Sequence, residues 1–398
     1  MGCKEGGWMT SYLVSNSPTN CYGCRACEQI CPRKAIVMKE NSEGFLYPIL
    51  MEDQCTKCGM CYQVCPYDSP SSVNVPIEAI AAQYKDRISL LASSSGGLFS
   101  ALADYVLANK GYVAGCIFDE SFNAVHILTN QKEMVEKMRG SKYVQSNLKN
   151  VYSDIQVCLR EGSLVMFTGT PCQVDGLRCF LRHEYSNLLT VDIICHGVPS
   201  PRLFALYIKS VSQKNGNILD IKFRDKQRNG WCSQGSITYS NKTKTISPYN
   251  SSYYYYYYYL KNCISRMSCY SCKYSTKARV SDVTIGDYWN ISDDFPDLDT
   301  SAGFSAVLLN TQKGKRFFAE ISSKLQTYET RLDAVVRGNG NLHAPTIMPK
   351  SRIDIYSRIA AEGYDSVAKK DCKYQYVKPF VRKHMPKGLK KILKKILR

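Results

Sequence analysis

The residues with the clearest chemical potential are cysteines, of which this chain of 398 residues has nineteen. Eight of them form two copies of one pattern, in which cysteines follow at intervals of three, three and four residues and a proline comes next. Three thiolates at that spacing wrap one iron–sulfur cube, and the fourth points away to ligate a second cube. The pattern therefore predicts two 4Fe-4S clusters, one held by Cys21, Cys24, Cys27 and Cys65, the other by Cys31, Cys55, Cys58 and Cys61.

Zinc is the alternative for such cysteines, but a zinc ion needs only four ligands and does not require this spacing twice. A disulfide scaffold does not fit, because the cysteine count is odd and Met1 to Ser11 has no apolar signal core. Two neighbouring clusters serve to pass single electrons. We therefore expect a ferredoxin-like dicluster domain that delivers electrons to, or takes them from, the rest of the chain.

The elements that must position this chemistry follow from the hydrophobic pattern. A Ser- and Pro-rich stretch, 69–76, ends the cysteine-rich part. Beyond it, short apolar runs predicted as strands alternate with stretches of helical periodicity, an order typical of an α/β protein with at least a partly parallel sheet. Expected helices lie at 97–109, 174–182 and 201–212, and expected strands at 111–118, 164–167, 188–194, 218–223, 283–288 and 304–310.

Three turns of this body stand where ligands are often bound. Ser93 to Gly97 precedes an expected helix, Thr168 to Gln173 links a strand to a helix, and Asp192 to Pro199 ends a strand. Taken alone, each is also an ordinary helix-capping turn, and neither a dinucleotide-binding fingerprint nor a Walker loop occurs.

Together with Gly140–Ser146, Phe223–Lys226, Cys269–Cys272 and Asp282–Trp289, these turns resemble the coenzyme F(420)-reducing hydrogenase/dehydrogenase beta-subunit family over roughly residues 88–310. The resemblance implies a flavoprotein that holds FAD and at least one 4Fe-4S cluster, and whose bacterial members include proteins of polysaccharide synthesis. The expected fold is thus an α+β ferredoxin-like dicluster domain followed by an α/β flavoprotein body with a mixed, partly parallel sheet. Domain bounds are expected at 1–75 for the dicluster domain, 85–165 and 166–345 for the N-terminal and C-terminal parts of the body, and 346–398 for a basic amphipathic tail.

A third cluster is expected in the body. Cys269 and Cys272 are its surest ligands, Cys172 and Cys195 stand at expected strand ends, and Cys263 competes for the fourth place, with zinc or free thiols as alternatives. By resemblance, the FAD site is lined by Ser94, Ser95, Gly96, Gly97, Lys142, Thr168, Gly169 and Thr170. His196 is the candidate catalytic residue, either a proton donor to substrate or only a hydrogen-bond donor to a cluster sulfur.

The charge of the chain is concentrated at its end, since residues 369–398 contribute +11 of the net charge of +18. Leu389, Ile392, Leu393, Ile396 and Leu397 recur at helical spacing among lysines, which is typical of a helix that lies on an anionic membrane. A solvated tail or a helix docked on a partner are the alternatives. We find no nucleic-acid-binding motif and expect a cytoplasmic protein, peripheral at the inner face of the membrane.

These observations predict an oxidoreductase that passes single electrons through 4Fe-4S clusters to or from FAD, which exchanges a hydride with an organic substrate. Its partners would be a redox protein or a reduced carrier. Two alternatives stay open at this point: an electron-transfer adaptor that feeds a partner enzyme, and a cluster-stabilised scaffold without redox chemistry.

Overall fold

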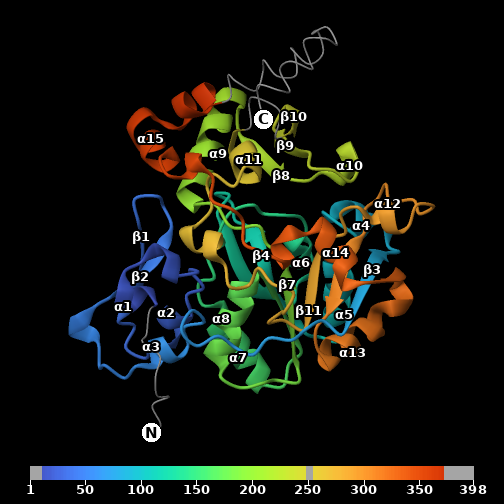
Figure 1. Ribbon diagram of the computed structural model, residues 1–398, viewed down its shortest axis with the longest axis horizontal. Helices are drawn as coiled ribbons and strands as arrows, with labels where there is room; N and C mark the ends of the chain where they lie inside the picture. The colour runs from blue at the N-terminus through green and yellow to red at the C-terminus, as the bar shows by residue number, and fades with distance from the viewer. Residues whose placement is uncertain (1–10, 248–253, 372–398) are drawn as a thin grey trace.

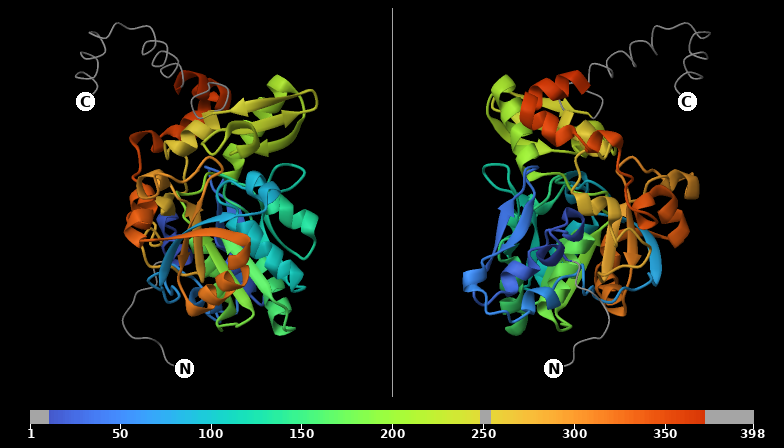
Figure 2. Two further views of the ribbon diagram at one scale, coloured as in Figure 1. Left: turned by 90° about the vertical axis from the view of Figure 1, so that its right-hand side faces the viewer. Right: turned by 60° about the vertical axis from the view of Figure 1, so that its left-hand side comes forward.

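The computed structural model describes residues 11–247 and 254–371. The chain has one large central sheet, with the cysteine-rich part and a smaller upper sheet beside it (Figure 1). The cysteine-rich part lies to one side of the sheet, and a smaller sheet with its helices lies above it (Figure 2). Within the described residues, none of the helices combines the length and the apolar character needed to cross a bilayer.

The cysteine-rich part is built from short elements. Its strands β1 and β2 form an antiparallel hairpin, in which Ile36 pairs with Leu50 and Glu40 with Leu46. Three short helices carry or flank the cysteine runs, and α2 packs against α3 as well as against α7 and α8 of the body. The bounds are Tyr12–Ser15 for α1, Ala26–Ile30 for α2, Ile36–Glu40 for β1, Leu46–Leu50 for β2 and Met60–Gln63 for α3.

The central sheet has eight strands in the order β13-β3-β12-β11-β7-β6-β4-β5. Strands β4, β6, β7 and β11 are parallel to one another, whereas β5, β12 and β13 run antiparallel to their neighbours. The sheet is therefore mixed and partly parallel, as predicted. Its strands are β3 at Glu78–Tyr84, β4 at Tyr112–Phe118, β5 at Ala124–Thr129, β6 at Val165–Gly169, β7 at Leu188–Ile193, β11 at Val283–Asp287, β12 at Ser305–Leu309 and β13 at Leu325–Thr330.

Helices cover both faces of this sheet, so its strands read as continuous apolar runs, such as β12 with all five residues buried. Helices α5 and α13 contact each other and one face, while α7 and α8 contact the other, beneath the cysteine-rich part. The bounds are Arg87–Ala92 for α4, Leu98–Ala108 for α5, Lys132–Met138 for α6, Val151–Arg160 for α7, Pro171–Leu181 for α8, Ile291–Asp294 for α12, Gln312–Ile321 for α13 and Leu332–Gly338 for α14.

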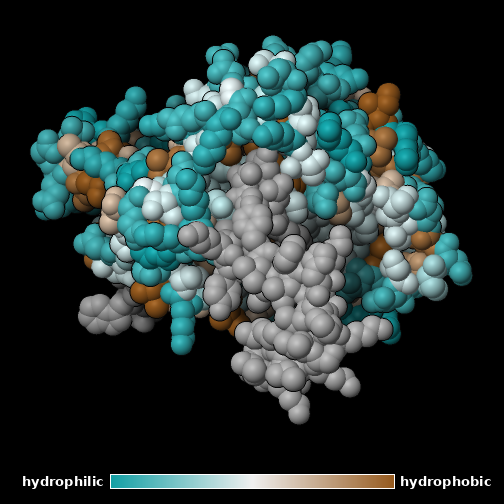
Figure 3. All heavy atoms as spheres, turned by 90° about the horizontal axis from the view of Figure 1, so that it is seen from above, coloured by the Kyte–Doolittle hydropathy of each residue, from teal (hydrophilic) through white to brown (hydrophobic). Residues whose placement is uncertain are grey.

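The upper layer is an antiparallel sheet in the order β10-β9-β8, packed with α9, α11 and α15 around an aromatic core. Four tyrosines of α11 are buried, namely Tyr255, Tyr256, Tyr258 and Tyr259. The bounds are Pro201–Asn215 for α9, Ile218–Lys222 for β8, Lys226–Asn229 for α10, Gly235–Tyr239 for β9, Lys242–Ile246 for β10, Tyr254–Leu260 for α11 and Ile355–Glu362 for α15. Seen from above, the described surface is mostly hydrophilic, with hydrophobic side chains in small separate groups (Figure 3).

The start predicted for the basic tail needs a correction. Residues 346–371 belong to the folded molecule, because Ile355, Ile359 and Val367 are buried in the core of the upper layer. Apolar side chains that can reach a core fold onto it, whatever the charge of the chain beyond them. The amphipathic stretch at 389–397 lies outside the described residues. The predicted boundary at 165 falls at the start of β6, so that both predicted parts of the body share one sheet.

Candidate iron–sulfur centres and ligand cavity

The first four predicted ligands lie around one cavity. Cys21, Cys24, Cys27 and Cys65 all line it, although Cys65 comes from the second copy of the motif. Helix α2 carries Cys27, and Cys65 follows α3, which packs against α2. Gly176 of α8 lies so close that a Cβ placed there would be 3.0 Å from the sulfur of Cys24, so the body itself forms one wall of this site.

The second set of ligands is more exposed. Cys58 is exposed, whereas Cys31, Cys55 and Cys61 are partly buried. Burial raises the pKa of Cys61, and the neighbouring thiols of Cys58 and Cys31 raise it further, which places the last residue of the first motif copy beside the second copy. At the first site Cys65 lines the same cavity as Cys21, Cys24 and Cys27, and the crossed assignment at the second site stays a prediction.

The body cysteines form a third site. Cys172, Cys195, Cys269 and Cys272 line one cavity, with Cys172 in the first turn of α8 and Cys195 two residues after β7. Cys263 takes no part, because its sulfur lies 3.1 Å from Ser351 Oγ in the upper core. The structure therefore excludes Cys263 from the open choice of fourth ligand and brings the other four candidates together.

The backbone at these sites repeats one arrangement. The amides of Gly23, Lys57 and Gly197 each lie two residues after a cysteine and donate to its sulfur, at 3.3, 3.3 and 3.4 Å from Cys21, Cys55 and Cys195. All three residues have positive φ, which turns the amide toward the sulfur. Amide donors of this kind stabilise charged sulfur and are one means by which proteins tune iron–sulfur clusters. The body site thus shares the local geometry of the two ferredoxin-type sites.

Burial raises the pKa of the Cys195 and Cys269 thiols to about 12. Such thiols become thiolates when a metal centre stabilises their charge. Among residues 11–247 and 254–371, no group of three or more His, Cys, Asp or Glu side chains is arranged to hold a single metal ion. Four cysteine thiols at one cavity are the donor set that a 4Fe-4S cluster requires. The donor set at all three sites fits 4Fe-4S clusters.

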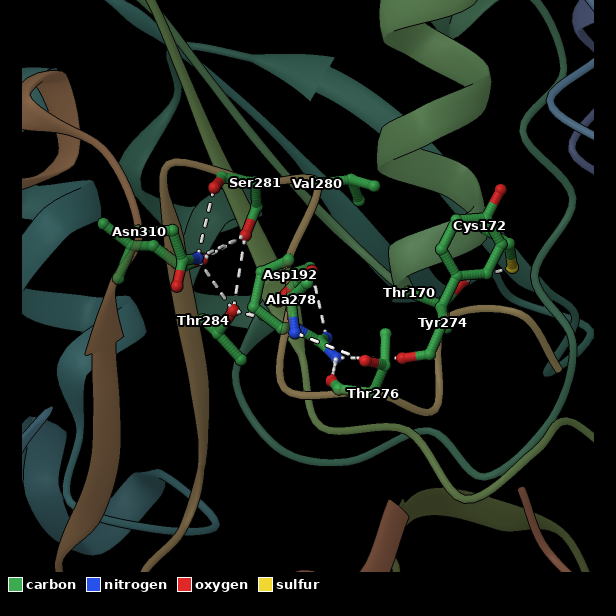
Figure 4. A network of polar contacts seen from close by, with 12 residues as sticks. Thr170, Cys172, Asp192, Tyr274, Thr276, Ala278, Val280, Ser281, Thr284 and Asn310 are labelled. Carbon is green, nitrogen blue, oxygen red and sulfur yellow. Dashed lines mark hydrogen bonds and ion pairs between the residues drawn. The ribbon is translucent and has the colours of Figure 1, made fainter. Parts of the chain in front are cut away.

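A buried ion pair borders the body site. Arg279, which lines that cavity, is 2% exposed and lies 3.0 Å from a carboxylate oxygen of Asp192, which is fully buried. Its guanidinium also donates to Thr284 Oγ1 at 3.1 Å and to the carbonyl of Tyr274 at 3.0 Å (Figure 4). Burial raises the pKa of Asp192, and the charge of Arg279 opposes that rise. The pair thus puts a fixed cation beside the cysteines.

A large cavity lies next to the body site, at the carboxyl ends of the parallel strands β4, β6, β7 and β11. Its volume is about 480 Å³, within the range of sites for drug-sized ligands. Residues of α11 and of the β8–β9 region close it from above. In an open α/β sheet this edge is where ligands bind. The predicted cofactor residues that line it are Ser94, Ser95, Gly97, Lys142, Thr168, Gly169 and Thr170.

Gly96 is a correction to the predicted lining. A Cβ on Gly96 would lie 2.1 Å from the carbonyl oxygen of Ala82 and 2.4 Å from the amide nitrogen of Ser305. This glycine is therefore needed because it packs against the backbones of β3 and β12, and it does not line the cavity.

Three of the predicted polar groups are already engaged within the protein. The Lys142 ammonium donates to the carbonyls of Lys137, Met138 and Arg139 at 2.8–3.0 Å, so it caps the end of α6 while it lines the cavity. Burial lowers the pKa of Lys142 to about 8. The hydroxyl of Ser95 donates to the carbonyl of Phe304 at 2.8 Å. Ser94 pairs with Ser141 at 2.9 Å, on the rim of the cavity.

Sequence reasoning missed His126, a buried residue of β5 that lines the cavity. Its Nε2 lies 3.0 Å from the carbonyl of Thr168, and burial lowers its pKa to about 4, so the ring is neutral at pH 7 and Nε2 carries the proton. Sequence reasoning also gave no role to Trp231, which stacks on the cavity residue Trp289 with ring centres 5.2 Å apart. No local motif marks either residue; only the folded sheet brings them here.

His196 stands between the large cavity and the four-cysteine site and lines both, as do Thr170, Cys195, Gly197 and Val198. Burial lowers its pKa, which favours the neutral ring. Tyr22 in turn lines both the four-cysteine site and the first ferredoxin-type site. Neighbouring cavities of the three therefore share wall residues, from the cysteine-rich part to the edge of the central sheet.

Comparison with known proteins agrees with this architecture. Residues 162–334 match the family model described as the C terminus of the coenzyme F420 hydrogenase/dehydrogenase beta subunit, and residues 20–69 match a 4Fe-4S dicluster domain. The chain is 22% identical over 335 residues to one of the subunits of the F(420)H(2) dehydrogenase of Methanosarcina mazei, covering 78% of this chain and 84% of that protein.

It is also 26% identical over 197 residues to the coenzyme F420-dependent sulfite reductase of Methanocaldococcus jannaschii, a match that covers 48% of this chain and only 30% of that longer protein. A solved structure of the F420-reducing [NiFe] hydrogenase complex from Methanosarcina barkeri is similar over 73% of this chain and 94% of that chain, with 15% identity and a TM-score of 0.48. A likeness of that degree carries no argument about function.

Proposed function

Because residues 162–334 belong to the coenzyme F420 hydrogenase/dehydrogenase beta-subunit family and residues 20–69 to the 4Fe-4S dicluster domains, we propose that this protein is an iron–sulfur flavoprotein oxidoreductase. Single electrons would pass through three 4Fe-4S clusters to or from FAD bound in the large cavity. The organic substrate would exchange a hydride there. The relatives named as F420-dependent sulfite reductase and as part of a dehydrogenase support the reaction class.

One observation carries the proposal: the three cavities are neighbours that share wall residues. Tyr22 belongs to the walls of the first and second, and Cys195 and His196 belong to the walls of the second and third. A bare ferredoxin would have no use for a cavity of about 480 Å³ directly behind its cysteines. The arrangement favours electron delivery to a bound organic molecule.

The protein's own residues would divide the work as follows. Twelve cysteines hold the clusters, and the amides of Gly23, Lys57 and Gly197 stabilise charge on their sulfurs. The turn at Ser94 and the amides at the start of α5 would receive phosphate groups. His196, neutral and next to Cys195, would hold or release a proton at the cavity. FAD, when bound, supplies the conversion between one-electron and two-electron transfer.

The test is cofactor analysis of anaerobically purified protein. We expect three clusters' content of iron and sulfide and close to one FAD per chain. Ser94→Trp would place an indole in the cavity and should weaken FAD binding at least tenfold without loss of iron. Ser323→Trp, at an exposed position of the chain, is the matched control and should keep both cofactors.

The outcomes separate the candidate functions. Iron and sulfide without flavin would contradict the proposal and favour an electron-transfer adaptor. Zinc as the only metal would contradict every redox role. A place in polysaccharide biosynthesis stays a prediction from the family resemblance.

A further inference from the structure

Arg266 is a buried cation whose surroundings are unusual. Its side chain is completely buried, and its guanidinium donates to the carbonyl of Cys21 at 2.8 Å, the carbonyl of Leu46 at 3.0 Å and Gln145 Oε1 at 3.1 Å. It also lies 3.9 Å from the centre of the Tyr47 ring. These neutral groups hold the guanidinium in one orientation but do not neutralise it, since arginine stays protonated in proteins.

The other deeply buried arginines each have a carboxylate. Arg279 pairs with Asp192, Arg352 with Glu43, and Arg224 with Asp287. Arg266 forms no ion pair with any carboxylate in the part of the chain that the structure describes. An isolated buried charge is strongly unfavourable, and natural proteins keep one only where an opposite charge compensates it. The missing partner is therefore expected among the groups that the site is built to bind.

The position of Arg266 identifies two such groups. It bonds the carbonyl of Cys21, and a Cβ on Gly23 would lie 3.1 Å from its Nη1, so it borders the first ferredoxin-type site. It also stands three residues before Cys269 of the body site. The carbonyl oxygen of Arg266 accepts from the amide of Cys269 at 2.9 Å, so Arg266 also borders the body site.

We propose that Arg266 is the shared counterion of two 4Fe-4S clusters, the one held by Cys21, Cys24, Cys27 and Cys65 and the one held by Cys172, Cys195, Cys269 and Cys272. This inference rests on the proposed function. Four thiolates outweigh the charge of an iron–sulfide core, so each ligated cluster is an anion, and it gains one further negative charge on reduction. A fixed cation between the two therefore favours the reduced form of both.

The consequence is a common shift of two potentials. Arg266 raises the reduction potentials of both clusters together, so the driving force for transfer between them is unchanged, while transfer to them from the outer cluster becomes more favourable. No bond or proton changes at Arg266 in this step. It is a positioning residue that acts through its charge. It raises the potentials of the two inner clusters relative to the potential of the outer one, held by Cys31, Cys55, Cys58 and Cys61.

The test is a redox titration of the cofactor-loaded full chain, followed by electron paramagnetic resonance. Arg266→Gln should lower the equilibrium constant for one-electron reduction about tenfold at two of the three clusters, a shift of 59 mV for each. The third cluster serves as an internal control and should not move. Arg266→Lys keeps the charge and should restore both potentials.

A second variant guards against loss of the fold. Gln145→Glu places a carboxylate 3.1 Å from the guanidinium, neutralises the cation without removing it, and should shift the same two clusters in the same direction. Arg337→Gln on α14 removes a cation that pairs with Asp294 of α12, and should leave all three potentials unchanged.

Unchanged potentials in Gln145→Glu, or a shift at one cluster alone, would overturn the shared-counterion role. The proposed function would survive that result as long as the wild type contains three clusters and FAD. A wild type that lacks the body cluster would overturn both.

Discussion

The contact between Glu43 and Arg352 yields a quantitative prediction about how the cysteine-rich part is held on the body. Glu43 lies in the turn between β1 and β2, and both oxygens of its carboxylate accept from Arg352, each at 2.7 Å. The arginine side chain is 3% exposed and that of Glu43 is 21% exposed. Arg352 also donates to the carbonyl of Ser265 at 2.9 Å, so the pair joins three segments that are distant in the sequence.

Glu43→Gln keeps the size of the side chain but removes its charge. One charge-assisted hydrogen bond becomes an ordinary one, and one guanidinium N–H is left facing an amide group. Breaking a fully buried pair costs about 3–5 kcal/mol, and because Glu43 retains some exposure we expect about 2–4 kcal/mol in the free energy of unfolding. With an m-value of about 3 kcal/mol/M, the urea midpoint falls by roughly 0.7–1.3 M.

The assay is urea unfolding under anaerobic conditions, followed by far-ultraviolet circular dichroism. Glu40→Gln is a matched control in the same hairpin, because Glu40 pairs with Arg202 of α9 while both side chains are 45% exposed. An exposed pair of this kind contributes about 0–1 kcal/mol. If Glu43→Gln and Glu40→Gln unfold at the same urea concentration, the reasoning from burial is refuted.

Three further predictions follow from other parts of the molecule. Cys172→Ser and Cys195→Ser should each remove one cluster's content of iron, measured by iron analysis. The control Cys263→Ser should keep the full iron content. Equal loss of iron in the three variants would contradict the ligand assignment. Burial lowers the pKa of Lys226 to about 7, whereas the pKa of an unfolded lysine is about 10.4. Between these two pH values the unfolded chain carries one proton more than the folded chain at this side chain. The free energy of unfolding should therefore rise with pH across that interval. Lys226→Met should flatten this rise, measured as denaturation midpoints at several pH values. Midpoints that rise with pH as steeply in the variant as in the wild type would contradict the prediction. Deletion of residues 386–398 should move the protein from membrane to soluble fractions, and an unchanged distribution would exclude attachment through this segment.

The elements that sequence reasoning found are those with a strong local pattern. The strands β6, β7 and β12 are apolar runs, and α5, α8 and α9 have helical periodicity with Pro or Gly at their starts. The strand β3, which sequence reasoning missed, lacks that pattern. β3 is rich in alanine, which has little preference for strands, and it becomes a strand because it lies between β12 and β13 in the sheet.

The candidate site divides in the same way. Sequence reasoning found most of the cavity lining through turns that stand at strand ends, because that edge of a sheet can be inferred from element order alone. It missed His126, Arg266 and Arg279, since a charged or ionisable residue in a sequence ordinarily indicates solvent exposure. Only the packing of the cysteine-rich part against the body shows that the two arginines are buried beside cysteines.

The ligands expected for the two ferredoxin-type centres could be named from the amino-acid sequence, because a repeated local spacing marks all eight cysteines. The ligands of the body centre have no such spacing, since Cys172 and Cys195 follow the neighbouring strands β6 and β7, whereas Cys269 and Cys272 lie at a short 3-10 helix that only the tertiary packing brings to the same cavity. The same tertiary packing decided the exclusion of Cys263, the course of the linked cavities and the burial of Arg266, all of which depend on contacts between segments that no local pattern connects.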